Sequence, residues 1–101
     1  MTSAGPQAAQ RRLHAVVRGR VQGVGFRFTT QYEGRKLGLA GWVRNCPDGS
    51  VEVEAEGPAA TLETFLSFLH RGPLGAHVDA VEERWLPPQG GAFTFEVRRT
   101  S

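Results

Sequence analysis

Alternating apolar and polar positions predict five strands along the chain. The clearest alternation, in residues 51–56, sets small apolar side chains against three glutamates. We expect this glutamate face to look at water, paired with neighbouring Arg18 or Arg98. The other predicted strands are residues 13–19, 39–45 and 77–86, and a last one that sets Phe93, Phe95 and Val97 on one face.

The strand predicted for residues 77–86 changes phase midway. Val78 and Ala80 belong to one phase of the alternation, whereas Val81 and Trp85 belong to the other. One extra residue in one strand of a pair produces such a shift, so we expect a β-bulge in this strand.

Two stretches have the periodicity of a helix. Residues 26–37 carry helix formers and set Phe28 and Tyr32 four residues apart on one face, although Gly34 lies within the stretch. A second helix begins near Pro58, which suits a helix start, and ends near Gly72. Its buried stripe is Leu62, Phe65, Leu66 and Leu69.

The order strand, helix, strand, strand, helix, strand, with one further strand added, predicts an α+β fold. We expect a ferredoxin-like split β-α-β sandwich, a mainly antiparallel sheet with two helices on one face. A tight turn at residues 47–49 makes the strands on either side of it a hairpin. We assign the domain to residues 11–99 and expect residues 1–10 to be a disordered N-terminal tail. The position of the last strand in the sheet stays open.

Length and composition fit one small domain. The chain has 101 residues, of which 40% are hydrophobic and 22% are charged. No stretch approaches the roughly 18 to 20 apolar residues that a membrane helix requires, and residues 1–10 lack the apolar segment of a secretory signal. We therefore expect a cytoplasmic protein without a membrane partner.

Charge and cysteine content bear on whether the protein binds nucleic acid or a metal. The 12 Lys and Arg residues nearly balance the 10 Asp and Glu residues, the formal net charge is +2, and basic residues occur in runs no longer than pairs. We therefore expect no nucleic-acid partner. The single cysteine and the three histidines show no zinc-binding spacing, so we expect no metal site.

The most informative stretch is GRVQGVGFR at residues 19–27, between the first strand and the first helix. Its glycines let successive backbone N–H groups point into one concavity, and the following helix adds its positive N-terminal end, so an anion would fit there. Arg27 could hold the same anion through two hydrogen bonds. On the residues alone, a glycine-rich turn that binds nothing fits equally well. The nucleoside-triphosphate loop and the dinucleotide fingerprint do not match, because Gly-Lys-Ser/Thr is missing and Phe28 replaces the third glycine.

Two motifs give the sequence a specific resemblance. GRVQGVGFR at residues 19–27 is followed by GWVRN at residues 41–45, and then by the pairs DG at residues 48–49 and VE at residues 51–52. Together, at this spacing, they resemble the acylphosphatase family. The similarity covers about residues 13–98, in the same order of strands and helices.

The resemblance implies an enzyme that hydrolyses the mixed anhydride of a carboxylate and phosphate to a free carboxylate and inorganic phosphate. In that family the arginine closing the first motif holds the phosphate with the loop amides, and the asparagine closing the second positions the attacking water. Those roles fall on Arg27 and Asn45. The phosphate-binding residues implied are Gln22, Gly23, Val24, Gly25, Phe26 and Arg27.

The same resemblance implies no metal, no other cofactor and no covalent intermediate. The expected partners are a small-molecule acyl phosphate and the inorganic phosphate product. Neither nucleic acid nor a membrane is expected to bind, and we expect a monomer.

Other functions fit the residues less well. Cys46 lies beside Asn45, but a cysteine phosphatase needs an arginine six positions after its cysteine, where this chain has Glu52. We expect Cys46 to be a bystander near the rim of the site. An RNA-binding module on this fold would use the open sheet face, where the glutamates of residues 51–56 would repel phosphates. A third possibility is a domain that binds a ligand without catalysis. The presence of both Arg27 and Asn45 counts against it.

Overall fold

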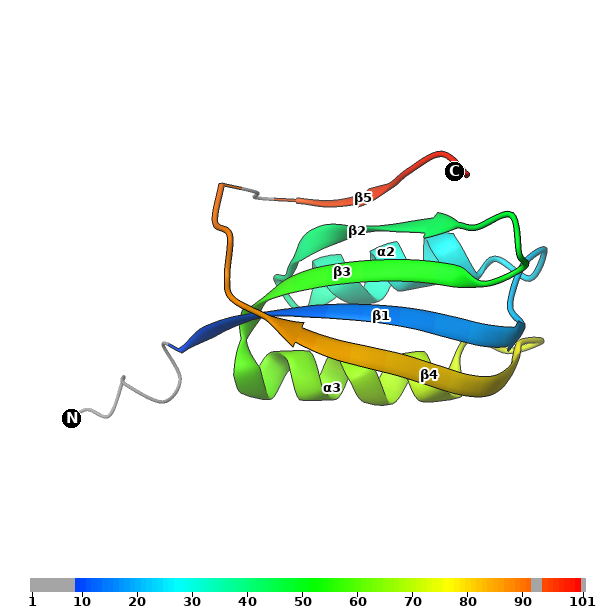
Figure 1. Ribbon diagram of the computed structural model, residues 1–101, viewed down its shortest axis with the longest axis horizontal. Helices are drawn as coiled ribbons and strands as arrows, with labels where there is room; N and C mark the ends of the chain where they lie inside the picture. The colour runs from blue at the N-terminus through cyan, green and yellow to red at the C-terminus, as the bar shows by residue number, and fades with distance from the viewer. Residues whose placement is uncertain (1–8, 92–93, 101) are drawn as a thin grey trace.

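Two helices pack on one face of a five-stranded sheet with the strand order β4-β1-β3-β2-β5 (Figure 1). The computed structural model describes residues 9–91 and 94–100. Neighbouring strands are antiparallel, except that β5 runs parallel to β2. The predicted ferredoxin-like α+β fold is confirmed, and the last strand lies at the β2 edge. The elements are β1 (Gln10–Arg20), α2 (Phe26–Lys36), β2 (Ala40–Asn45), β3 (Val51–Pro58), α3 (Ala59–Arg71), β4 (His77–Leu86) and β5 (Phe95–Val97).

The first strand starts earlier than the alternation predicts. β1 begins at Gln10, which lies opposite Pro58 of β3, instead of at residue 13. Phe93, predicted to open the last strand, lies outside the described residues, as do residues 1–8 of the predicted tail. Within the described ranges, no helix is long and apolar enough to cross a membrane.

The core lies between the sheet and the helices, and phenylalanine rings join its elements. Ring centroids are 6.2 Å apart for Phe26 and Phe68, 6.4 Å for Phe65 and Phe68, and 5.6 Å for Phe65 and Phe95. Phe26 is the first residue of α2 and is 1% exposed. Its burial therefore anchors the beginning of α2, directly after the glycine-rich loop.

Phe95 packs β5 onto α2 at Gly34. A Cβ at Gly34 would collide with the Phe95 ring, so packing requires the glycine inside this helix. Gln31 Nε2 and Arg35 Nε donate hydrogen bonds to the carbonyl oxygen of Phe95 at 3.1 Å and 3.2 Å. The residue that lowers the helix propensity thus makes room for the last strand.

The predicted β-bulge in β4 is confirmed. Arg18 lies opposite Ala80, whereas Gly19 lies opposite Val78, so Asp79 is the extra residue. The shift lets Val78 and Val81 both pack against the core.

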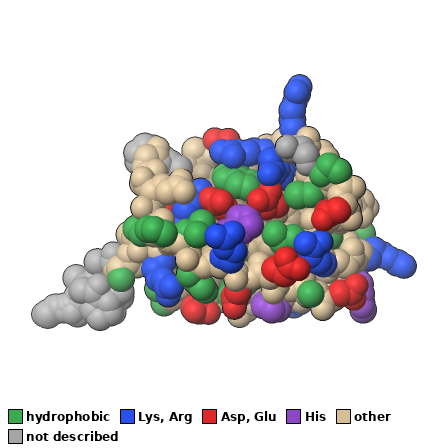
Figure 2. Space-filling view, viewed as in Figure 1, with side chains coloured by type: hydrophobic (Ala, Val, Ile, Leu, Met, Phe, Trp, Pro, Cys, Tyr) green, Lys and Arg blue, Asp and Glu red, His purple; other side chains and the backbone are tan. Residues whose placement is uncertain are grey.

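The sheet face away from the helices carries a network of charged side chains (Figure 2). Arg12 pairs with Glu54 at 2.6 Å and with Glu56 at 3.0 Å, although its side chain is only 8% exposed. Glu52 Oε2 lies 2.7 Å from His14 Nε2. Each of these glutamate side chains is at most 17% exposed.

The prediction that these glutamates look at water and pair with Arg18 or Arg98 is therefore wrong. The strand register brings other cations closer, because Arg12 of β1 lies opposite Glu56 and Arg44 of β2 lies opposite Glu52.

Candidate active site

Three segments that are separate in the sequence meet at one end of the sheet (Figure 1). They are the loop of residues 21–25 after β1, the first turn of α2, and the turn of residues 46–50 that joins β2 to β3. All the residues that the sequence assigns to the site lie in these segments or directly beside them.

Two glycines in the left-handed conformation shape the loop of residues 21–25. Gly23 has φ 77° and Gly25 has φ 76°, which side chains other than glycine rarely adopt. A Cβ at either position would meet no other atom, so the backbone conformation, and not lack of space, requires glycine.

This loop leaves a run of backbone donors unpaired. Within the described part of the chain, the N–H groups of residues 22–28 donate to no backbone acceptor, and the next N–H, that of Thr29, bonds to the carbonyl oxygen of Gly25 at 3.0 Å. The first turn of α2 also contains no acidic residue and receives no side-chain cap. The positive end of the helix therefore has no negative partner on its own first turn.

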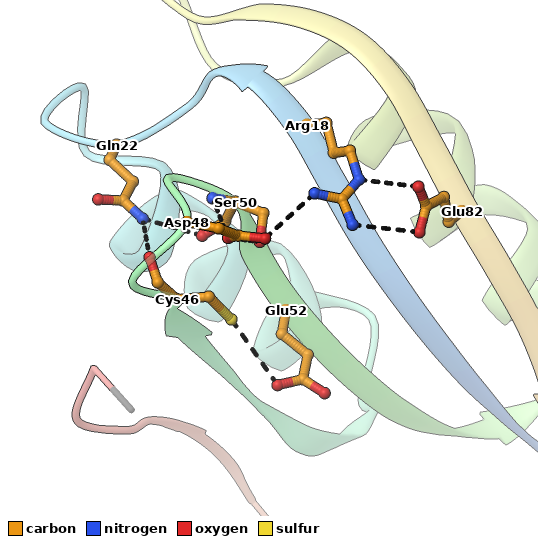
Figure 3. Close-up of polar contacts among 7 residues, drawn as sticks. All are labelled: Arg18, Gln22, Cys46, Asp48, Ser50, Glu52 and Glu82. Atoms are coloured by element: carbon orange, nitrogen blue, oxygen red, sulfur yellow. Dashed lines mark hydrogen bonds and ion pairs between the residues drawn. The ribbon is translucent and has the colours of Figure 1, made fainter.

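The side chain of Gln22 joins the loop to the turn after β2 (Figure 3). Its Nε2 donates hydrogen bonds to the carbonyl oxygens of Cys46 at 2.8 Å and Ser50 at 2.9 Å. The Cys46 N–H also donates to the Ser50 carbonyl oxygen, at 2.9 Å, which closes the turn. Of the donors of Gln22, the backbone N–H is the one left for the anion that the sequence predicts here.

Arg27 is available to bind an anion. It lies on the first turn of α2 and is half-buried. Among the described residues, no carboxylate is within ion-pair distance of its guanidinium, whose carbon lies 5.7 Å from the centroid of the Phe28 ring. An arginine beside unpaired N–H groups and without a carboxylate partner is suited to a bidentate contact with phosphate.

Asn45 ends β2 and carries an unpaired polar atom. Strand alternation sets it on the same side of the sheet as the buried Val43, which is the side covered by the helices. Its Oδ1 is buried and has no hydrogen-bond partner in residues 9–91 and 94–100. Leaving such an oxygen unpaired costs about 1 to 3 kcal/mol, and such atoms in native structures call for an explanation, of which a catalytic role is one.

Asp48 shapes the turn between β2 and β3. Its Oδ1 accepts hydrogen bonds from Ser50 Oγ at 2.6 Å and from the Ser50 N–H at 3.0 Å, and its Oδ2 accepts one from Arg18 at 3.2 Å. These bonds, with that from the Ser50 hydroxyl first, lower the pKa of Asp48 to about 2. An ionised carboxylate with three donors is a structural acceptor, so Asp48 belongs to the turn, as the sequence predicts.

Cys46 points away from Asn45. Its Sγ lies 3.9 Å from Glu52 Oε1 (Figure 3), which Arg44 also contacts through Nη2 at 2.6 Å. Glu52 belongs to the open-face network with His14, whereas Asn45 lies on the helix side. The two neighbours thus occupy opposite faces of the sheet, which counts against Cys46 as the nucleophile.

Ser50 is the residue of this region that sequence reasoning missed. It holds Asp48 through its side chain and offers its carbonyl oxygen to Gln22. The signal was the spacing Asp-Gly-Ser, since an aspartate often bonds to the backbone N–H two residues later in a turn.

Within the described ranges, no three His, Cys, Asp or Glu side chains gather where they could hold a metal ion.

A family model described as Acylphosphatase matches residues 13–97. The chain belongs to the acylphosphatase family. An acylphosphatase from Anaeromyxobacter dehalogenans is 51% identical over 87 residues, which are 86% of this chain and 94% of the relative. An acylphosphatase from Thermus thermophilus is 55% identical over 74 residues, which are 73% of this chain and 84% of the relative.

Solved acylphosphatases have the same architecture. The crystal structure of acylphosphatase from Bacillus subtilis matches with a TM-score of 0.84 and 38% identity, covering 87% of this chain and 98% of that chain. As a member of the acylphosphatase family, the chain is an enzyme, a hydrolase of acyl phosphates. Both sequence motifs lie within the matched residues 13–97.

Proposed function

We propose that the chain hydrolyses acyl phosphates by direct attack of water on phosphorus, without a metal and without a covalent intermediate. The N–H groups of residues 22–27 and the guanidinium of Arg27 bind the phosphate, and Asn45 holds the water. The observation that carries the proposal is the run of unpaired N–H groups from residue 22 to residue 28, at the uncapped positive end of α2.

The loop and Arg27 supply the charge stabilisation. Backbone N–H groups that point into one concavity bind phosphate oxygens, and the helix end adds a fixed positive potential. Arg27 adds two parallel hydrogen bonds. Because these donors are fixed before the substrate arrives, they stabilise the charge that develops on the phosphoryl oxygens without reorganisation.

Asn45 positions the nucleophile. A side-chain amide cannot take up a proton at neutral pH, so Asn45 orients the water and does not act as a base. The unpaired Oδ1 accepts a hydrogen bond from the water, which directs an oxygen lone pair towards phosphorus. The bond from water to phosphorus forms, the bond from phosphorus to the acyl oxygen breaks, and the proton of the water passes to a phosphate oxygen.

The leaving group explains why so few catalytic groups suffice. A carboxylate has a conjugate-acid pKa of about 4, so it departs at neutral pH without a general acid. The mixed anhydride is therefore reactive enough for catalysis by positioning and fixed donors.

We propose in addition that the domain, whose first strand begins at Gln10, works as a cytoplasmic monomer on small molecules, with neither nucleic acid nor a membrane as partner. The open sheet face supports this proposal against an RNA-binding function. Trp42, an aromatic residue there, has the guanidinium carbons of Arg44 and Arg98 at 5.3 Å and 4.8 Å from its ring centroid. Cations that cover the ring leave less of it for base stacking.

The test measures phosphate release from acetyl phosphate and from a phosphate monoester, each with and without a metal chelator. We expect hydrolysis of acetyl phosphate that chelation does not change, little action on the monoester, and competition by inorganic phosphate. In water enriched with heavy oxygen, the label should enter phosphate and not acetate. Loss of activity in chelator, a preference for the monoester, or label in acetate would each contradict the mechanism.

A further inference from the structure

The exposed side of α2 carries two aromatic rings that take no part in the core. Phe28 and Tyr32 are each 63% exposed and lie four residues apart, so they share one face of the helix. They line a surface groove together with Gln31, Arg35 and Lys36. A groove with two exposed rings on one helix face is a candidate for ligand contact.

The groove begins beside the proposed phosphate site. Phe28 follows Arg27 directly, and the Arg27 guanidinium carbon is 5.7 Å from the centroid of its ring. A phosphate held by Arg27 therefore has an aromatic surface next to it. From Phe28 to Lys36 the helix rises about 12 Å, at about 1.5 Å per residue.

The far end of the groove is positively charged. Lys36 Nζ lies 5.8 Å from the centroid of the Tyr32 ring, and its ion pair with Glu33, at 3.4 Å, is exposed and thus weak. The Nε of Arg35 donates to the Phe95 carbonyl oxygen, which holds this guanidinium along the groove.

We infer that this groove binds the acyl part of the substrate, and that it favours an elongated, apolar acyl group with a carboxylate at its far end. This inference rests on the proposed function, because it takes the phosphate to lie at Arg27. The apolar body of the acyl group packs on Phe28 and Tyr32, and its terminal carboxylate lies near Lys36. A short acyl group such as acetyl reaches none of the far residues.

Three substrates test this inference: acetyl phosphate, the acyl phosphate of a biphenyl carboxylic acid, and the same compound with a terminal carboxylate. In the parent, kcat/KM should rise in that order. Ratios of kcat/KM between substrates are the decisive quantity, because a variant that merely damages the phosphate site lowers all three together.

Tyr32→Ala should lower the ratio of the uncharged biphenyl substrate to acetyl phosphate by about tenfold, the usual effect of one lost apolar contact. Lys36→Gln should lower the ratio of the carboxylated to the uncharged biphenyl substrate by about threefold, since an exposed charge pair is weak. Leu74→Ala is the control for the loss of an exposed apolar side chain, because Leu74 is fully exposed and outside the groove. Arg84→Gln, on the open sheet face, is the control for net charge.

Parent-like ratios in Tyr32→Ala and Lys36→Gln would overturn the assignment of the groove. The proposed function would still stand, because acetyl phosphate would still be hydrolysed. A parent protein that hydrolyses none of the three substrates would overturn both.

Discussion

The side-chain amide of Gln22 donates a hydrogen bond to the carbonyl oxygen of Cys46 at 2.8 Å, and so ties the anion loop to the residue that follows Asn45. The same nitrogen bonds to the Ser50 carbonyl oxygen at 2.9 Å. The phosphate donors of the proposed mechanism lie in the loop after β1 and the first turn of α2, whereas the water-holding residue ends β2. Gln22 is the side chain that fixes one relative to the other, which makes it a positioning residue.

Replacing Gln22 tests this role. Gln22→Ala removes both bonds, so we expect kcat for acetyl phosphate to fall about tenfold or more, because the water and the phosphorus lose their fixed geometry. Gln22→Glu has the same shape but presents an acceptor to two carbonyl oxygens, so it should not restore kcat. Turnover and phosphate affinity are to be measured for both variants. Gln89→Ala is the control, at an exposed position after β4 that lies beside the other end of β3, where the Gln89 N–H bonds to Glu56. Parent-like kcat in Gln22→Ala and Gln22→Glu would contradict the role.

Arg27→Lys should lower kcat/KM for acetyl phosphate by about 100-fold and weaken inhibition by inorganic phosphate. The ammonium is a point charge and cannot make the two parallel hydrogen bonds of a guanidinium. Arg11→Lys is a matched control, because the Arg11 guanidinium carbon lies 4.4 Å from the centroid of an aromatic ring, that of Trp85, near the start of β1 and so at the other end of the sheet. Parent-like phosphate inhibition in Arg27→Lys would move the anion site elsewhere.

Cys46→Ser should keep turnover of acetyl phosphate within about twofold of the parent. The thiol lies beside Glu52 on the open sheet face, whereas Asn45 lies on the helix side. The backbone of residue 46, which accepts the bond from Gln22, is unchanged in this variant. Rapid-quench digestion and mass spectrometry of the parent should find no phosphorylated cysteine, and finding one would replace the water mechanism by a covalent one.

The strands, helices and bulge were predictable because burial on one side of a strand or helix leaves a period in the sequence. The bulge at Asp79 is an example, since Val78 and Val81 pack against the same core only if one residue is extra. The partners of the glutamates were not predictable in this way. Alternation gives the face on which Glu52 lies, but the strand register places Arg44 directly opposite it. His14 and Arg18 each lie two residues from Val16, the β1 partner of Glu52, and Arg18 pairs instead with Asp48 and Glu82.

Some features of the candidate site could likewise be predicted from the sequence, and others could not. Its glycines are visible in the sequence because left-handed backbone positions select glycine, as at Gly23 and Gly25. The role of the Gln22 side chain was not visible, because its partners are backbone carbonyl oxygens, which every residue has. The unpaired state of Asn45 Oδ1 likewise depends on what packs around it.

The network on the open sheet face predicts an acid-sensitive contribution to stability at Glu56. Its carboxylate accepts hydrogen bonds from the N–H groups of Gln89 and Gly90, both at 2.8 Å, and pairs with Arg12. Burial raises the pKa of Glu56, but these bonds together outweigh it and hold the pKa below its usual 4.5. Because the folded-state pKa is lower than the unfolded one, the stabilisation is complete above that usual value and is lost as the pH falls through the folded-state pKa.

Glu56→Gln should therefore lower the free energy of unfolding by about 1 kcal/mol at neutral pH, the order of one net hydrogen bond, and by less in acid. Urea unfolding of parent and variant at about pH 7 and at about pH 3 measures the difference. Glu63→Gln, at an exposed position on α3, is the control and should differ little from the parent at either pH. A Glu56→Gln deficit that is the same at both pH values would contradict the acid-sensitive contribution.

Asn45→Ala separates catalysis from both binding and stability. Removing the amide takes away the group that orients the water, so kcat for acetyl phosphate should fall by about 10² to 10³, as for the loss of one fixed donor. Phosphate affinity should stay near that of the parent, because Arg27 and the loop N–H groups remain.

The stability of Asn45→Ala gives the sharpest readout. Truncating a residue that serves packing lowers the free energy of unfolding, whereas removing an unpaired polar atom that serves catalysis leaves it unchanged or raises it. The Oδ1 of Asn45 is buried without a partner, so its removal deletes an unpaired polar atom and should leave the free energy of unfolding unchanged or raise it. Val43→Ala, which truncates the fully buried neighbour on the same face of β2, should instead destabilise the fold by about 1 to 3 kcal/mol. Urea unfolding, phosphate titration and turnover on the three proteins test the assignment together. A slow Asn45→Ala variant that is as destabilised as Val43→Ala, or that loses phosphate binding along with turnover, would mean that Asn45 supports the site and does not hold the water.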